Sequence, residues 1–156
     1  MYSPIGMVMA VHARDNSPDP STKVGATVAQ ESGKIAAVGW NDFPTGVEST
    51  DNRWDDREQK YPRVIHAEAA ALIGAMNAGI SVKGGTLYTT EFPCCNCCGL
   101  IIQAGIKHVV SQDLESDYAE RWSDQIKISM TMFEEAGVTL EVIPRQVEVV
   151  NCQSLR

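Results

Sequence analysis

The residues best suited to chemistry are a histidine and a glutamate two positions apart, followed along the chain by four clustered cysteines. An imidazole and two thiolates at Cys-x-x-Cys spacing provide three ligands for a tetrahedral zinc ion and leave its fourth position open. Zinc lowers the pKa of a bound water molecule toward neutrality, and a neighbouring carboxylate can carry the released proton. The pattern therefore predicts a hydrolytic zinc site, with His66 and two cysteines as ligands and Glu68 as the catalytic proton carrier.

Two Cys-x-x-Cys pairs are possible, because the cysteines overlap in sequence. A proline directly precedes the first cysteine, and the residues after the last one have the composition of a helix. The first pair then lies at the N-terminus of that helix, where unpaired N–H groups and the helix dipole favour thiolates. We therefore predict that the ligands are Cys94 and Cys97, and that Cys95 and Cys98 act as small apolar residues that face other directions.

Three other interpretations of the cysteines stay open. A redox Cys-x-x-Cys pair and two buried free thiols both leave the glutamate beside the histidine without a role. A closed structural zinc site, as in a zinc-stabilised interaction module, needs a fourth protein ligand. The candidates for that ligand are Cys95, Cys98, Cys152, His12 and His108.

The ligands must be positioned by helices and strands that the pattern of apolar residues predicts. Two β-rich runs joined by a short turn predict a hairpin, and the later strands alternate with helical segments. Connections of the type strand, helix, strand favour parallel neighbours, whereas the hairpin adds an antiparallel pair. We therefore expect an α/β fold with a mixed five-stranded sheet and helices on both faces. The expected strands are 24–30, 35–40, 86–90, 108–111 and 138–143. Helices are expected over 66–78 and 118–136, and two further helices are expected to begin at Pro4 and at the cysteines. A polar loop is expected over 47–61.

Size, charge and cysteine content limit the possible classes of protein. The chain has 156 residues, 44% of them apolar, which suits a single domain over residues 1–156 with 145–156 as a C-terminal tail. A net charge of -7 argues against a nucleic-acid binder, because phosphate neutralisation needs a basic face. Five cysteines, most of them clustered, fit a reducing cytoplasm better than a disulfide framework. Neither a membrane-spanning run nor a secretion signal is indicated.

The sequence around the predicted metal site resembles a known family. The elements His66-Ala67-Glu68 and Pro93-Cys94-x-x-Cys97 are similar to the signature of zinc-dependent nucleobase deaminases. The resemblance narrows to the deoxycytidylate (dCMP) deaminases, within the zinc-dependent cytidine/deoxycytidylate deaminase superfamily, through the stretches 19–26, 39–46, 61–68 and 101–107. It implies a three-layer α/β/α cytidine deaminase-like fold and hydrolysis of dCMP to dUMP and ammonia, which supplies dUMP for dTMP synthesis. A deaminase for another base or nucleoside, such as cytidine, guanine or an adenosine in tRNA, is the alternative.

The same resemblance implies substrate contacts. Ser21 and Lys23 lie in a loop near the expected mouth of the site and are candidates for the 5'-phosphate, although such residues are also common in solvated loops. Asn41 offers a donor and an acceptor that suit a ribose hydroxyl, with a turn-forming asparagine as the alternative. The backbone around Ala67 is expected to read the base edge, and Phe92 to pack against the ring or within the core.

A regulatory site is implied as well. The stretch Gly-x-Asn-x-x-Pro-x-Gly at 39–46 is similar to a site of the family at which dCTP activates and dTTP inhibits together with a magnesium ion. Acidic residues of the polar loop that follows are candidates to help hold that ion. The resemblance also implies a homo-oligomer, a homohexamer as in the family. Nucleotides are its expected small-molecule partners. The implied effector contacts are Asn41, Phe43, Pro44 and Gly46.

Overall fold

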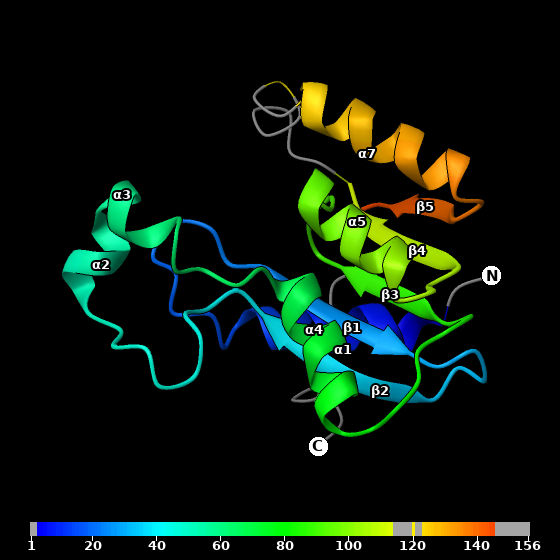
Figure 1. Ribbon diagram of the computed structural model, residues 1–156, viewed down its shortest axis with the longest axis horizontal. Coiled ribbons are helices and arrows are strands. Elements are labelled where there is room, and N and C mark those ends of the chain that lie inside the picture. The colour runs from blue at the N-terminus through cyan, green and yellow to red at the C-terminus, as the bar shows by residue number, and fades with distance from the viewer. Residues whose placement is uncertain (1–2, 114–119, 121–122, 146–156) are drawn as a thin grey trace, which may run out of the picture.

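Five strands form one sheet that runs through the molecule (Figure 1). The computed structural model describes residues 3–113, 120 and 123–145. The strands are β1 (Gly25–Ala29), β2 (Ile35–Trp40), β3 (Thr86–Thr89), β4 (His108–Gln112) and β5 (Thr139–Ile143). They lie in the order β2-β1-β3-β4-β5, with β1 antiparallel to both neighbours and β3, β4 and β5 parallel. The predicted mixed five-stranded sheet is therefore confirmed.

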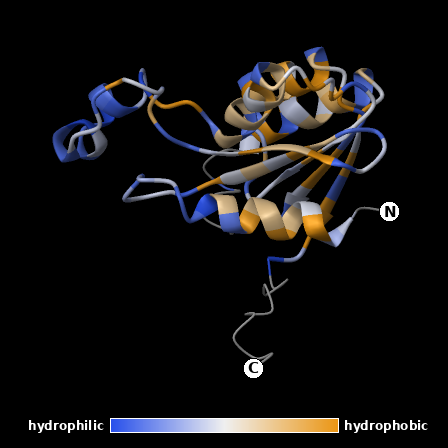
Figure 2. Ribbon diagram, turned by 90° about the horizontal axis from the view of Figure 1, so that it is seen from below, coloured by the Kyte–Doolittle hydropathy of each residue, from blue (hydrophilic) through white to orange (hydrophobic). Residues whose placement is uncertain are grey.

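Helices cover both faces of the sheet (Figure 2). They are α1 (Pro4–Arg14) on one face, and α4 (Ala67–Asn77), α5 (Cys95–Gln103) and α7 (Ser123–Glu135) on the other. Under α1, the side chains of Met7 and Ala10 pack against Tyr88 in one apolar cluster. A larger cluster on the opposite face includes Leu87 of the sheet and Phe133 of α7. This arrangement confirms the three-layer α/β/α prediction.

Most predicted elements lie within a few residues of their expected bounds, which is the usual uncertainty at helix and strand ends. The expected helix 118–136 corresponds to α7, while residues 118, 119, 121 and 122 of it lie outside the described part of the chain. The same is true of residues 146–156 of the predicted tail. No described helix combines the length and apolar character that a bilayer crossing demands.

A close approach between β2 and α4 fixes where the N-terminus of α4 lies. Ala67, Ala71 and Ala75 are fully buried on the side of α4 that faces the sheet. Gly39 of β2 lies so near the helix that a Cβ atom there would collide with the backbone of Ala67 and Ala71. Small residues on both sides therefore bring the helix against the strand, and the first turn of α4 is held in place.

The segment that connects β2 to α4 extends away from the body of the fold (Figure 1). Residues 43–64, here called the projecting segment, contain two short helices, α2 (Asp51–Asp55) and α3 (Arg57–Lys60). The prediction of an irregular polar loop over 47–61 is wrong for these two helices. The two ends of the projecting segment are joined by an antiparallel bridge between Asp42 and Ile65, in which the two residues exchange backbone hydrogen bonds of 3.2 and 2.8 Å.

Local contacts explain the order within the projecting segment. The carboxylate of Asp56 accepts the N–H of Glu58 at 2.9 Å and caps the start of α3. Trp54 is buried and stacks on Phe43, with the ring centroids 4.0 Å apart and the rings nearly parallel. The segment therefore has a small apolar centre of its own, although most of its residues are polar or charged and no apolar pattern predicts it.

The close contact at Gly39 gives a test of this packing. Gly39→Ala should lower the free energy of unfolding by about 2 kcal/mol, because the added methyl group forces β2 and α4 apart. Urea denaturation measures the change. Gly99→Ala is the matched control, since a Cβ there meets only Met132 at 3.8 Å and alanine favours the helix. Equal stabilities of the two variants would contradict the proposed packing.

Candidate metal centre and active site

Three potential metal ligands come together where two helices begin. His66 is the N-cap residue of α4, Cys94 is the N-cap residue of α5, and Cys97 lies in the first turn of α5. The Sγ atoms of Cys94 and Cys97 lie 3.4 and 3.5 Å from Nδ1 of His66. All three ligand atoms lie within 4.8 Å of one another, and no other group of this kind occurs among the described residues.

The geometry of this cluster fits zinc. Zinc bonds to sulfur and nitrogen at lengths that place tetrahedral ligand atoms about 3.6 Å apart. The separations of 3.4 and 3.5 Å between sulfur and nitrogen agree with that value. Three soft or borderline donors with room for a fourth, external ligand are the donor set of a catalytic zinc site.

The second pair of cysteines points toward α7. Cys95 donates a weak S–H hydrogen bond to the carbonyl of Gln125, and Cys98 donates one to the carbonyl of Ser129, both at 3.4 Å. The hydroxyl of Ser129 in turn donates to the carbonyl of Pro93 at 3.1 Å. Cys95 and Cys98 therefore point toward α7, while Cys94 and Cys97 point toward His66.

The other candidates for a fourth ligand have different surroundings. His12 lies exposed on α1, on the opposite face of the sheet. His108 is exposed at the start of β4, where Nδ1 lies 2.6 Å from the hydroxyl of Thr139. Cys152 lies outside the described residues.

The side chains of the cluster differ in how readily they lose their protons. A hydrogen bond from Cys97, aided by His66, lowers the pKa of Cys94 to about 4. The same contact with the Cys94 thiolate, together with burial, raises the pKa of Cys97 above its usual range. The pKa of His66 is also raised, chiefly by its hydrogen bond with Cys94. Cys94 is therefore a thiolate at neutral pH, whereas the thiol of Cys97 carries a proton that a metal ion must displace.

Glu68 lies beside this cluster in the first turn of α4. Its side chain is buried, and the hydroxyl of Thr89 donates to Oε1 at 3.3 Å. Burial raises the pKa of the Glu68 carboxyl above its ordinary value. A buried carboxyl group next to a metal centre is equipped to accept a proton and hold it during a reaction.

The predicted base-contacting residues flank the cluster. Ala67 is fully buried at the start of α4, next to both His66 and Glu68 in sequence. Phe92 is also buried, in the loop between β3 and the first cysteine. Both positions lie along the two chain segments that carry the potential ligands.

Asn41 and the predicted phosphate contacts belong to a second polar cluster. The side-chain amide of Asn41 accepts the N–H of Val24 at 2.7 Å and donates to the carbonyl of Thr22 at 2.8 Å. Ser21 and Lys23 lie exposed in the same loop, and Ser21 accepts a hydrogen bond from Lys60 at 3.0 Å. The amide of Asn41 thus holds the loop that carries the two phosphate candidates.

The centre of that second cluster is Asp19, which the sequence interpretation did not identify. Lys60 of the projecting segment forms an ion pair with it at 2.7 Å, and both side chains are largely buried. Burial by itself raises the pKa of Asp19, but Lys60 and the N–H groups of Ser21 and Thr22 outweigh it and hold the pKa below its ordinary value. The only available signal was the position of Asp19 at the start of the family-like stretch 19–26.

Arg145 is a second contact that the sequence interpretation missed. The sequence places it in the predicted tail, but its guanidinium group reaches Glu91 at 2.8 Å and the carbonyl of Asp113 at 2.6 Å. Glu91 lies in the loop that precedes Cys94, the first cysteine of the cluster. Arg145 therefore fastens that loop to the ends of β4 and β5.

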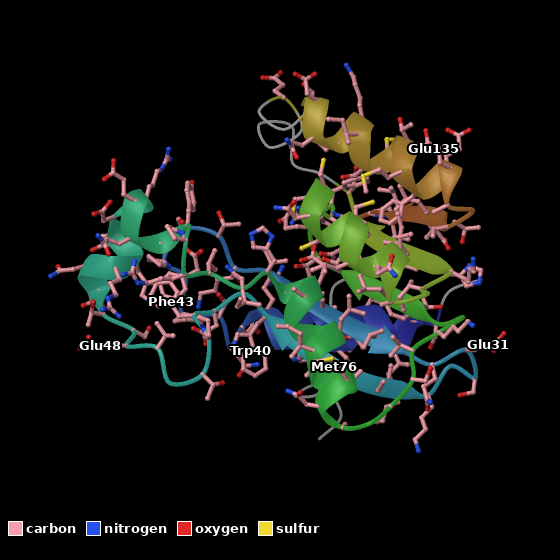
Figure 3. The ribbon with its side chains drawn as sticks, in the orientation of Figure 1. Glu31, Trp40, Phe43, Glu48, Met76 and Glu135 are labelled. Carbon is pink, nitrogen blue, oxygen red and sulfur yellow. The ribbon has the colours of Figure 1, made fainter. Side chains whose placement is uncertain are left out.

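The predicted effector residues lie at the base of the projecting segment. Phe43 is buried against Trp54, among the side chains of this segment and apart from the body of the fold (Figure 3). Pro44 and Gly46 are exposed, and Gly46 has a positive φ of 86°, which favours glycine. These residues follow Asn41 in the chain, with Asp42 between Asn41 and Phe43.

The fold and the site together are those of a zinc-binding deaminase. The chain belongs to the cytidine and deoxycytidylate deaminase family, because residues 5–112 match the family's region described as the cytidine and deoxycytidylate deaminase zinc-binding region.

Individual relatives agree with this membership. The chain is 37% identical over 131 residues to an uncharacterized deaminase in the luxG 3' region of Aliivibrio fischeri, covering 84% of this chain and 86% of that protein. It is 34% identical over 150 residues to human deoxycytidylate deaminase, covering 92% and 81%. The crystal structure of dCMP deaminase from cyanophage S-TIM5 in complex with dCMP and dUMP is similar with a TM-score of 0.73 and 28% identity, covering 92% and 100%.

Metal binding should release protons from this cluster. At pH 7 we expect at least one proton to leave per zinc ion, because Cys97, whose pKa is raised above that of an ordinary thiol, must lose its proton to act as a ligand. Zinc affinity should fall as the pH is lowered. Calorimetric titration of the metal-free protein in buffers of different ionisation enthalpy measures the number of protons. Binding without proton release would contradict the assignment of these ligands.

Proposed function

We propose that this chain hydrolyses dCMP to dUMP and ammonia, and so supplies dUMP for dTMP synthesis. The observation that carries the proposal is the cluster of His66, Cys94 and Cys97 beside the buried carboxyl group of Glu68. It is supported by the similarity to human deoxycytidylate deaminase and to the cyanophage enzyme that was crystallised with dCMP and dUMP.

The metal ligands and Glu68 have different roles in the proposed reaction. A zinc ion held by His66, Cys94 and Cys97 would supply a water molecule of lowered pKa as the nucleophile. Glu68 accepts the proton that the attacking water gives up and delivers a proton to N3 of the cytosine. It then takes the second proton from the hydroxyl group added at C4 and passes it to the amino group, so that the C4–N bond breaks, ammonia leaves and the C4 carbonyl of dUMP forms. Its raised pKa suits this double role, because burial makes the protonated form of this carboxyl group more favourable than in an exposed glutamate.

Substrate contacts are assigned around this centre. We infer that the backbone at Ala67 reads the base edge and that Phe92 packs against the ring, since both lie on the segments that carry the ligands. Ser21 and Lys23 are proposed to bind the 5'-phosphate, because both are exposed on a loop held by the internal contacts of Asn41. A ribose contact for Asn41 would have to use hydrogen-bonding capacity beyond these internal bonds.

Replacing the proton carrier tests the function. Glu68→Gln should lower kcat on dCMP by about 100-fold to 10,000-fold, because the amide cannot accept the proton, while zinc content stays at the wild-type level. An ultraviolet assay measures turnover, and metal analysis measures zinc. Glu135→Gln, an exposed glutamate on α7, is the matched control with unchanged activity (Figure 3).

The substrate panel includes dCMP, cytidine and guanine. Faster turnover of cytidine or guanine than of dCMP would make this a deaminase for another substrate, and unchanged activity of Glu68→Gln would remove Glu68 from the mechanism.

Regulation by nucleotides is the second part of the proposal. We propose that Asn41, Phe43, Pro44 and Gly46 contact dCTP as an activator and dTTP as an inhibitor, each with Mg²⁺. The exposed positions of Pro44 and Gly46 beside a buried aromatic pair support a nucleotide contact there. We also propose a homohexamer in the reducing cytoplasm. Half-exposed apolar side chains on the helix layer, such as Ile73, Met76 and Leu100, support contacts between copies.

Saturation curves test the regulation. With Mg²⁺ present, dCTP should shift half-saturation by dCMP to lower concentrations and dTTP to higher ones, each by about fivefold or more. Light scattering coupled to size exclusion measures the oligomeric state under the same conditions. Curves that respond to neither nucleotide would show that this chain lacks the proposed effector site.

A further inference from the structure

The hydroxyl group of Thr89 lies between Glu68 and the loop that leads to the metal-binding cysteines. Thr89 is the last residue of β3, and its Oγ1 atom lies 3.3 Å from Oε1 of Glu68. The same atom lies 2.9 Å from the carbonyl oxygen of Glu91, whose N–H donates back to it at 3.4 Å. The side chain is 0% exposed, so these contacts are shielded from bulk water.

The backbone of Thr89 does not require this hydroxyl group. Thr89 pairs with Ala26 of β1 on one side and with Ser111 of β4 on the other, so the sheet holds the strand in place. Valine has nearly the same shape as threonine and a strong preference for strands. A buried hydroxyl costs free energy unless it is hydrogen-bonded. Neither the pairing of the strands nor the packing of the side chain therefore explains why this residue carries a hydroxyl group.

Burial alone does not distinguish Thr89. Thr27 on the neighbouring strand is equally buried, and its hydroxyl has no hydrogen-bond partner among the described residues. The two residues differ in what their hydroxyl groups contact. Thr89 faces the carboxyl group of Glu68 and the loop before Cys94, and Thr27 pairs with Tyr88, whose side chain packs under α1 on the other face of the sheet.

We propose that Thr89 is a positioning residue for Glu68. Its single O–H is shared between the carboxyl group of Glu68 and the carbonyl of Glu91, and its Oγ1 accepts the N–H of Glu91, so the hydroxyl fixes the orientation of the carboxyl group relative to the backbone of that loop. A shift of about 1 Å in a catalytic group can cost about 100-fold in rate, so a single well-placed donor is enough to matter. This inference rests on the proposed role of Glu68 as the proton carrier.

The test compares Thr89→Val with Thr89→Ser in the zinc-loaded full chain. Thr89→Val removes the hydroxyl at nearly constant volume and should lower kcat on dCMP by about tenfold or more, with KM changed less than about twofold. Thr89→Ser keeps the donor and should restore kcat to within about threefold of the wild type. Zinc content and melting temperature are measured for both. Thr27→Val is the matched control and should leave kcat unchanged.

Several results would overturn the inference. Wild-type kcat in Thr89→Val would do so, as would equal losses in Thr89→Val and Thr89→Ser, or loss of zinc from Thr89→Val. If that variant does not fold, a crystal structure of the zinc-loaded wild type decides, because a separation above about 4 Å between Oγ1 of Thr89 and the Glu68 carboxylate excludes the hydrogen bond. A wild-type chain that does not deaminate dCMP would refute the proposed function instead, and the two failures are therefore distinguishable.

Discussion

Two helix N-termini must be held within a few ångströms of each other before three ligand atoms can share one metal ion. His66 and Cys94 are the N-cap residues of α4 and α5, so the metal centre exists only while these helices keep their relative position. The buried alanines of α4 and the missing side chain of Gly39 press the first helix onto β2. The second helix is held by β3, which precedes it, and by its contacts with α7. The chemistry therefore depends on packing that lies outside the site.

Helical spacing decides which cysteines can meet His66. Residues three apart in the first turn lie on nearly the same side of a helix, whereas adjacent residues differ by about 100° in direction. Cys94 and Cys97 can therefore face α4 together only if Cys95 and Cys98 face elsewhere, and α7 supplies that other surface. Ser129 of α7 receives Cys98 through its carbonyl and holds Pro93 through its hydroxyl, so the same residue fixes the start of the cysteine helix.

The parts that the sequence predicted are those with a local signal. The strands, the main helices and the position of Cys94 and Cys97 at the start of a helix follow from apolar periodicity, turn residues and capping, all of which act over a few positions. The missed contacts join distant segments, such as Lys60 with Asp19 and Arg145 with Glu91, and no short-range pattern marks them. The two helices of the projecting segment were missed for a related reason. Their order depends on the stacking of Trp54 on Phe43, whereas the intervening sequence is charged and has no apolar period.

The polar cluster around Asp19 connects three segments that are distant in the sequence. Asp19 accepts hydrogen bonds from the backbone of its own loop, from Asn41 at the end of β2 and from Lys60 of the projecting segment. Because its carboxylate is buried and multiply bonded, these three regions cannot shift independently without leaving a charge unpaired, which is costly. The bridge between Asp42 and Ile65 adds a second link, one residue before His66. A displacement of residues 43–46 therefore acts on the loop of Ser21 and Lys23 and on His66 through the same few contacts, and such a contiguous set of contacts is what energetic coupling between two parts of a protein requires.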